Sequence, residues 1–254
     1  MSEAPRDPMR AAQANMRPAP IRRCYKSVEA SQAEGGVYAL FLDGRPARTP
    51  GRNRLAARSL PLMERVAEEW ERQRETIEPS DMPLTRLLNS AIDGVAGAVA
   101  ETRAEILKYA ASDLLCYRAE EAETLAERQR VGFDPVLDWA AETLGARFRL
   151  GAGVVHVEQP TDAIEAVRGA LEAFDDPVAL AGLSAMTTLS GSALLALAIA
   201  RGFLSSKEAW RAAHIDEDFE IERWGADAEA SARREARWRE FEAAALAVRL
   251  LRGA

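Results

Sequence analysis

The chain has 254 residues, of which 48% are hydrophobic and 29% charged, and its formal net charge is −7. This composition excludes a wholly disordered chain, and the acidic balance disfavours nucleic acid as a partner because like charges repel. The two cysteines, Cys24 and Cys116, belong to no paired-cysteine motif. The sequence therefore predicts no disulfide framework or structural zinc site, and reduced thiols indicate a cytoplasmic location.

The distribution of residue types predicts three parts. Residues 1–20 contain four prolines among scattered charges and are predicted to form a flexible tail. Residues 21–82 are predicted to form a β-rich N-terminal lobe with one helix, and residues 83–254 a helical C-terminal lobe. The predicted fold class is therefore α+β, with a small β-rich N-terminal lobe followed by a larger all-helical C-terminal lobe.

Strand signals dominate the start of the N-terminal lobe. Alternation within residues 21–29 predicts a first strand, and residues 37–42 form a stronger candidate. Asp43-Gly44 is typical of a two-residue hairpin turn, in which both residues need a positive φ. Residues 45–49 are the predicted return strand, which Pro46 restricts to the edge of the sheet because proline donates no hydrogen bond.

Helical periodicity begins after Ser59, the predicted N-cap of a helix that reaches Ile77. Pro83 opens the next helix, in which Arg86 and Asn89 are candidates either for ordering the junction between the lobes or for contacting a ligand. A further helix is expected over residues 99–117.

In the middle of the C-terminal lobe, the sequence predicts two more helices and a short strand or hairpin. Asp113 and Arg118 are candidates for an ion pair in the core, and Asp134-Pro135 predicts an N-cap followed by proline at the first helical position. Residues 148–157 alternate like a short strand or hairpin, and Thr161 is the predicted cap of a helix to residue 174.

No charge lies between Asp176 and Arg201, which is long enough for a membrane span. Polar and small residues interrupt the middle of this stretch, and a helix that is apolar all round is also typical of a protein core. We therefore expect one buried helix over residues 177–201 and no stable membrane insertion.

The densest polar cluster, residues 216–222, falls in a helix predicted to run from the Ser205–Glu208 capping box to Gly225, with Asp227 capping the last helix. At about 100° per residue, one direction of that helix carries Glu217 at its centre. The residues that share this direction are Trp210, Ala213, His214, Ile221 and Trp224. A carboxylate on an aromatic stripe needs an internal arginine or hydroxyl partner, or it belongs to a surface that receives another protein. A divalent metal held by the carboxylates is the third possibility.

The sequence contains none of the common motifs for nucleotide binding or nucleophilic catalysis. The sequence has no Walker A loop, no complete dinucleotide-binding fingerprint and no nucleophile elbow, and His156 and His214 are its only histidines. We therefore expect no cofactor, no small-molecule substrate and no enzyme activity. The rival class is an enzyme that uses a metal bound by residues 216–222.

An ordered series of motifs across about residues 22–250 resembles a known family, the assembly chaperones of F-type ATP synthase called the ATP-twelve family. The matching residues are Phe41-Leu42-Asp43-Gly44-Arg45-Pro46, Thr49-Pro50, Glu69-Trp70 with Gln73, Met82-Pro83-Leu84-Thr85-Arg86 with Asn89, Asp113-Leu114-Leu115-Cys116-Tyr117-Arg118, Gly191-Ser192, Asp216-Glu217, Ile221-Glu222 and Trp224-Gly225.

The resemblance implies a chaperone that binds the unassembled α subunit of the catalytic head and prevents its aggregation until the β subunit displaces it. It also implies a functional acidic residue in the helix before Trp224-Gly225, for which Glu217 is the candidate. The partner-binding residues expected on this basis are Glu217, Trp224, Glu220, Glu222 and Trp210. A protein-binding scaffold unconnected with ATP synthase is the remaining alternative.

Overall fold

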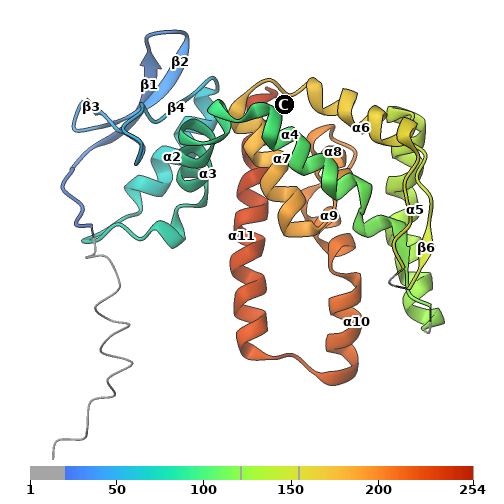
Figure 1. Ribbon diagram of the computed structural model, residues 1–254. Helices are drawn as coiled ribbons and strands as arrows, with labels where there is room; N and C mark the ends of the chain where they lie inside the picture. Colours follow the sequence, from blue (N-terminus) through green and yellow to red (C-terminus); the bar gives the residue numbers. More distant parts are fainter. Residues whose placement is uncertain (1–20, 121, 154, 254) are drawn as a thin grey trace, which may run out of the picture.

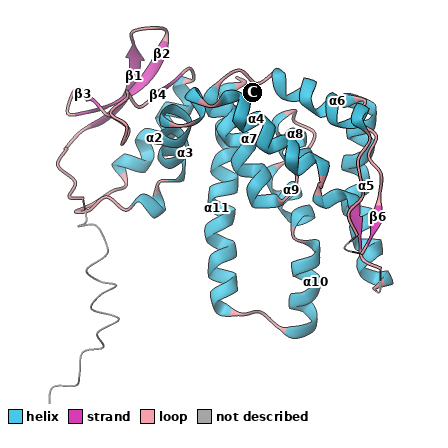
Figure 2. Cartoon of the chain, in the orientation of Figure 1, coloured by secondary structure: helices cyan, strands magenta, loops and turns pink. Residues whose placement is uncertain are grey.

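The computed structural model describes residues 21–253 except 121 and 154, so the predicted tail, residues 1–20, lies outside the described residues. A small antiparallel sheet lies at one end of the molecule, and helices form most of the rest (Figures 1 and 2). The predicted α+β fold, with a small β lobe and a larger helical lobe, is confirmed.

The sheet is built around a central hairpin. Strand β1 (Val28–Ala33) pairs with β2 (Val37–Leu42), whose other edge pairs with β3 (Arg45–Pro46) and β4 (Ala56–Ala57), all antiparallel. Strand β3 is thus an edge strand, as its proline predicts, although it is shorter than expected. The first strand also begins later than predicted.

Local chemistry explains the turn after β2. Asp43 and Gly44 have φ angles of 48° and 73°, as the predicted hairpin turn requires. The Asp43 carboxylate accepts hydrogen bonds from the backbone N–H groups of Lys26 and Ser27 at 2.9 and 2.8 Å. These donors lower the pKa of Asp43 and fix the chain that enters β1.

Helix α2 (Leu60–Glu71) covers the sheet and is capped by Ser59, as predicted. The helix ends at Glu71, so the prediction that it reaches Ile77 is wrong. The Ile77 N–H donates to the Ile21 carbonyl oxygen at 2.8 Å, so this segment is extended and pairs with the start of the described chain.

Helices α3 (Pro83–Asp93) and α4 (Val99–Ala111) follow. The predicted helix over residues 99–117 stops early because Asp113 turns the chain. One oxygen of its buried carboxylate accepts the Leu115 N–H at 3.1 Å, and the other accepts the Leu194 N–H at 3.1 Å. Arg118 pairs with Asp134 at 2.6 Å, so the predicted Asp113–Arg118 pair is wrong.

Helix α5 (Glu123–Trp139) contains Pro135 in its interior, so the predicted helix start at Asp134-Pro135 is wrong. Proline removes the hydrogen bond to the carbonyl four residues earlier, at Val131, and that residue is 61% exposed, so water can replace the missing donor. A π-helical turn over residues 140–144 then leads to Gly145, whose φ of 76° ends the helix.

Among the described residues of 148–157, the predicted strand or hairpin is present as a two-residue strand and not as a hairpin. Strand β6 (Gly151–Ala152) instead pairs in parallel with β5 (Tyr117–Arg118). Helix α6 (Thr161–Glu172) follows, with Thr161 as its first residue rather than its cap.

The uncharged stretch forms two helices, α7 (Pro177–Ser190) and α8 (Ala193–Ala200), rather than one. Gly191 has a φ of 74°, and the Ser192 hydroxyl accepts the Leu195 N–H, so one helix ends and the next begins within two residues. Both helices are buried, which confirms the core interpretation. In the described part of the chain, no helix combines the length and apolarity needed to cross a membrane.

Helices α9 (Ser206–Ala213), α10 (Ile215–Trp224) and α11 (Ala228–Leu251) complete the fold. The capping box and the Asp227 cap are confirmed, but the helix predicted up to Gly225 is broken at His214, whose φ and ψ of −119° and 19° are not helical. Helices α7 and α11 contribute to both hydrophobic cores, that of the helices and that beneath the sheet.

Candidate functional site

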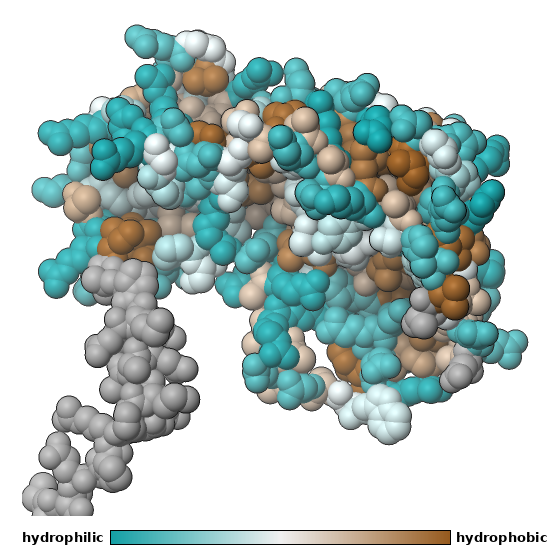
Figure 3. Space-filling model, viewed as in Figure 1, coloured by the Kyte–Doolittle hydropathy of each residue, from teal (hydrophilic) through white to brown (hydrophobic). Residues whose placement is uncertain are grey.

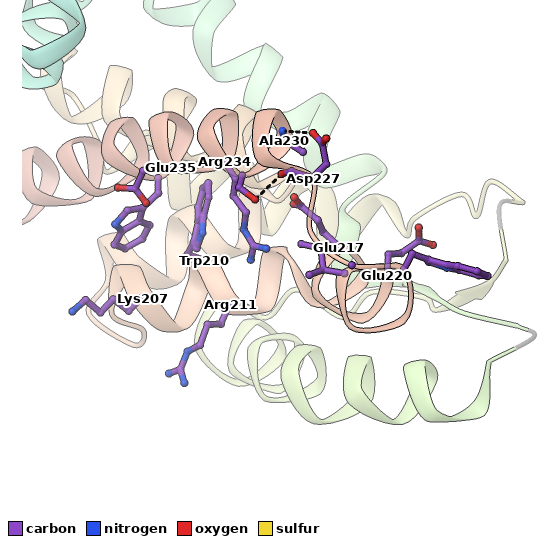
Figure 4. Close-up of a pocket in the computed structure, with 14 residues that line it drawn as sticks. Lys207, Trp210, Arg211, Glu217, Glu220, Asp227, Ala230, Arg234 and Glu235 are labelled. Atoms are coloured by element: carbon purple, nitrogen blue, oxygen red, sulfur yellow. Dashed lines mark hydrogen bonds between the residues drawn. The ribbon is translucent and has the colours of Figure 1, made fainter.

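The α9–α11 hollow, of about 870 Å³, lies between α9 and α10 on one side and the first half of α11 on the other (Figure 4). Figure 3 shows hydrophobic side chains among hydrophilic ones in the region of α10 and α11. The apolar side chains that line the hollow are Trp210, Ile221, Trp224, Ala230 and Trp238. The charged ones are Lys207, Arg211, Glu217, Glu220, Asp227, Arg234 and Glu235.

Helix α10 is fixed mainly by its contact with α5. Phe219 is its only buried residue, and the guanidinium groups of Arg128 and Arg223 lie 5.3 and 4.4 Å from the centre of the Phe219 ring. Gly132 of α5 lets the helices approach closely, because a Cβ atom there would collide with the side chain of Ile215. The opposite side of α10 is therefore left facing the hollow.

Three carboxylates of the acidic cluster are engaged within the chain. Asp216 accepts the Gln129 amide N–H at 2.7 Å, and Asp218 pairs with Arg234 at 2.5 Å. Glu222 receives both terminal nitrogens of Arg128, at 2.7 and 2.9 Å, and this pairing lowers the pKa of Glu222. These partners lie on α5 and α11, so the cluster is divided among different neighbours.

Glu217 has no comparable partner among the described residues. Its side chain is 39% exposed, and the one basic group within 4 Å is His214, whose Nε2 lies 3.9 Å away. The His214 Nδ1 must donate to the Trp210 carbonyl at 2.8 Å, and burial lowers the pKa of His214. The neutral ring therefore turns an unprotonated Nε2 toward Glu217 and supplies no balancing charge.

The tryptophans around Glu217 divide into a fixed floor and an exposed edge. Trp210 is 8% exposed, and its ring centre lies 3.9 Å from that of His214 and 5.5 Å from that of Trp238. Trp224, at the end of α10, is 82% exposed. An exposed tryptophan that lines the same hollow as a carboxylate without a close partner is typical of a protein-binding surface, because tryptophan is enriched among residues that dominate interface energies.

The structure brings together four of the five predicted partner-binding residues. Trp210, Glu217, Glu220 and Trp224 all line the hollow, whereas Glu222 faces α5 and does not. The predicted aromatic stripe requires one continuous helix, and the break at His214 shows that this requirement is not met. The helices on either side of the break still face the same hollow.

The contribution of α11 is absent from the sequence-based prediction. Arg234 lies beside Glu217 and Trp210 in Figure 4, and Trp238 follows Arg234 by one helical turn. The four-residue spacing of Arg234 and Trp238 is the signal that could have indicated a shared face, because residues at this spacing are neighbours on a helix surface.

The metal-dependent alternative finds no geometric support in the described ranges. Among residues 21–253, apart from the two that are not described, no three histidine, cysteine, aspartate or glutamate side chains gather closely enough to hold a metal ion. The division of residues 216–222 among separate partners explains this.

Glu69 and Arg86, from two of the other motifs, have partners within the chain. Glu69 is 2% exposed, and its carboxylate accepts the N–H groups of Leu84 and Thr85, each at 2.8 Å, at the start of α3. Burial raises the pKa of Glu69, and these donors oppose the shift. Arg86 pairs with Glu240 of α11 at 3.0 Å, which fits the junction-ordering alternative for Arg86.

Comparison with known proteins agrees with this arrangement. A family model described as ATP12 chaperone protein matches residues 22–141. The crystal structure of the Atu1473 protein from Agrobacterium tumefaciens is 45% identical, covers 98% of this chain and 92% of its own, and superposes with a TM-score of 0.89. Atp12 from Paracoccus denitrificans is 39% identical over 91% of this chain and 98% of its own, with a TM-score of 0.84. The mitochondrial protein atp12 of Schizosaccharomyces pombe is 23% identical over 217 residues, which are 81% of this chain and 74% of that protein.

These similarities define the class of protein as an assembly chaperone. The chain belongs to the ATP12 family of ATP synthase assembly chaperones, which confirms the resemblance carried by its motifs. The family model ends before the α9–α11 hollow, whereas the match to the Agrobacterium structure extends over nearly the whole chain.

Proposed function

We propose that this chaperone binds the unassembled α subunit of the ATP synthase catalytic head and prevents its aggregation until the β subunit displaces it. A subunit that waits for its partner exposes an apolar interface, and such a surface promotes aggregation. A chaperone that covers this interface must bind well and still yield to a partner with a more complementary surface.

The observation that carries the proposal is the unpaired Glu217 in a hollow lined by tryptophans. A basic side chain of the client would pair with Glu217, and apolar side chains next to it would contact Trp224 and the floor formed by Trp210. Glu220, on the exposed side of α10, would add to the attraction of a basic segment. Pairing in this half-buried place would be stronger than on an open surface because less water screens it.

The test is light scattering by isolated α subunit that is warmed with and without the chaperone. We expect suppression near equimolar chaperone, and release of the client when β subunit is added. Glu217→Lys should fold normally and lose most of this suppression, because lysine repels the basic group that glutamate attracts.

Glu222→Lys is the matched control, since it makes the same charge change on the same helix but faces α5. It should suppress aggregation as the wild type does. Full suppression by Glu217→Lys would refute the role of the hollow, and failure of the wild-type protein to suppress aggregation would refute the α subunit as client. Equal loss in both variants would show that only the total charge of α10 matters.

A further inference from the structure

A second cavity lies along the other half of α11. This arginine groove, of about 1170 Å³, is formed by α2, the connection between α8 and α9, and the C-terminal half of α11. Its apolar lining includes Leu84, Leu204, Leu246 and Leu250. Six arginines line it as well: Arg65, Arg72, Arg201, Arg239, Arg249 and Arg252.

The charge balance of the groove is opposite to that of the whole chain. Six arginines face four carboxylates there, those of Glu64, Glu69, Asp81 and Glu242, although the chain has a net charge of −7. The α9–α11 hollow has the reverse balance, with three basic and four acidic side chains. The two halves of α11 therefore border cavities of opposite sign.

Several of these arginines have no ion-pair partner among the described residues. Arg239 pairs with Asp81 at 3.6 Å and Arg65 with Glu68 at 2.6 Å, and Glu69 is committed to the start of α3. In the part of the chain that the structure describes, no carboxylate lies within ion-pair distance of Arg72, Arg201 or Arg249. A group of unpaired cations beside leucines is complementary to a ligand that carries both carboxylates and apolar side chains.

We propose that the arginine groove is a second docking surface, which receives an acidic protein segment with an apolar face. Carboxylates of that segment pair with Arg201 and Arg249, and its apolar side chains contact Leu246 and Leu250. The inference rests on the proposed function in one respect, namely that the segment belongs to the α subunit. A basic region of the client then lies at the α9–α11 hollow, on the first half of α11, and an acidic region of the client lies in the arginine groove, on the C-terminal half. This arrangement allows the client to bind in one orientation only.

Two other occupants fit the groove less well. A free phosphate ion matches the arginines but leaves the leucines exposed, and it is far smaller than the groove. Residues 1–20 of the chain carry Arg6, Arg10 and Arg17 against Glu3 and Asp7, so their charge is not complementary to the groove.

The first experiment measures the chemistry of the groove without the client. A short, fluorescein-labelled, helix-forming peptide of leucine and glutamate is titrated with the full-length chaperone, and a leucine–lysine peptide serves as the comparison. We expect the acidic peptide to bind the wild type, and the double variant Arg201→Glu/Arg249→Glu to bind it about tenfold more weakly.

Arg45→Glu/Arg147→Glu is the matched control, because it changes the charge by the same amount. Both of these arginines are exposed, and neither lines one of the two cavities. This control should bind the acidic peptide as the wild type does. No binding of the acidic peptide to the wild type, equal weakening in the control, weaker binding of the lysine peptide by Arg201→Glu/Arg249→Glu, or displacement of the acidic peptide by inorganic phosphate beyond the effect of ionic strength would each overturn the proposal.

The second experiment repeats the measurement with isolated α subunit. Wild-type binding that weakens about tenfold in Arg201→Glu/Arg249→Glu, but not in the control, assigns the acidic segment to this client. Unchanged affinity overturns that assignment. Absence of binding by the wild type, together with a positive peptide result, refutes the proposed client and leaves the acidic-segment groove standing.

Discussion

The α2–α3 junction and the α9–α11 hollow each place a glutamate near a tryptophan, with opposite consequences. At the junction, the Thr85 hydroxyl donates to Glu69 at 2.7 Å and accepts the Trp70 indole N–H at 3.1 Å, so both side chains are satisfied within the chain. In the hollow, the one basic group of the described residues within 4 Å of the Glu217 carboxylate is His214, and Trp224 is 82% exposed. Hydrogen bonding, rather than residue type, therefore separates the structural carboxylate from the candidate binding carboxylate.

The difference also shows which carboxylate the fold can lose. Glu69 occupies the start of α3, where N–H groups lack helical partners, and its removal would leave buried donors unpaired. Glu217 satisfies no backbone group among the described residues. The fold is therefore sensitive to changes at Glu69 and tolerant of changes at Glu217.

The largest expected effect is on stability at the junction. Glu69→Gln should lower the free energy of unfolding by about 3 kcal/mol, because the amide offers one acceptor oxygen where the carboxylate offers two, and its NH₂ group would face a buried N–H. Urea denaturation measures this loss. Glu68→Gln, on the exposed neighbour, is the control and should change stability little. A junction variant as stable as its control would show that Glu69 is not structural.

A second buried carboxylate predicts a change with pH. Burial raises the pKa of Asp113 from 3.8 to about 6, against hydrogen bonds from Ser192 and Leu194. Between these two values the folded protein binds more protons at this residue than the unfolded chain, so its contribution to stability falls as the pH rises. The fall amounts to about 3 kcal/mol and is complete slightly above pH 6.

Asp113→Asn does not titrate and should lack this pH dependence. We expect the free energy of unfolding of the variant, relative to the wild type, to rise by up to about 3 kcal/mol between about pH 4 and pH 7. Urea titrations at a series of pH values measure the difference, since the other carboxylates are common to both proteins. A constant difference across this range would mean that the pKa of Asp113 is not raised.

The smallest expected effect concerns the exposed tryptophan of the α9–α11 hollow. Trp224→Ala should leave the urea midpoint almost unchanged, because the side chain is exposed in the free chaperone. If the α subunit covers Trp224 as proposed, the variant should bind that subunit about tenfold more weakly. Val131→Ala, on the exposed surface of α5 outside the hollow, is the control for the loss of an exposed apolar side chain and should bind as the wild type does. Lost stability with unchanged binding would assign Trp224 to the fold.

Features whose partners lie within a few residues were predictable from the sequence. The Asp43-Gly44 turn, the Ser59 and Asp227 caps and the Ser205–Glu208 capping box all appear as expected. Each depends on backbone geometry or on a side chain that reaches an N–H group in the next turn. The ordered series of motifs also identified the family from the sequence.

Features that depend on distant partners were decided by the tertiary structure. Asp216 and Glu222 are engaged by α5 residues 87 and 94 positions away, so no local pattern indicated that Glu217 would remain without a strong partner. The parallel pairing of β5 with β6 likewise depends on contact between separate segments. The sequence by itself determined the local elements, the family and the candidate carboxylate. Only the packing of α5, α10 and α11 decided which acidic side chains remain available to a client, because their charges are balanced across the fold and not along the chain.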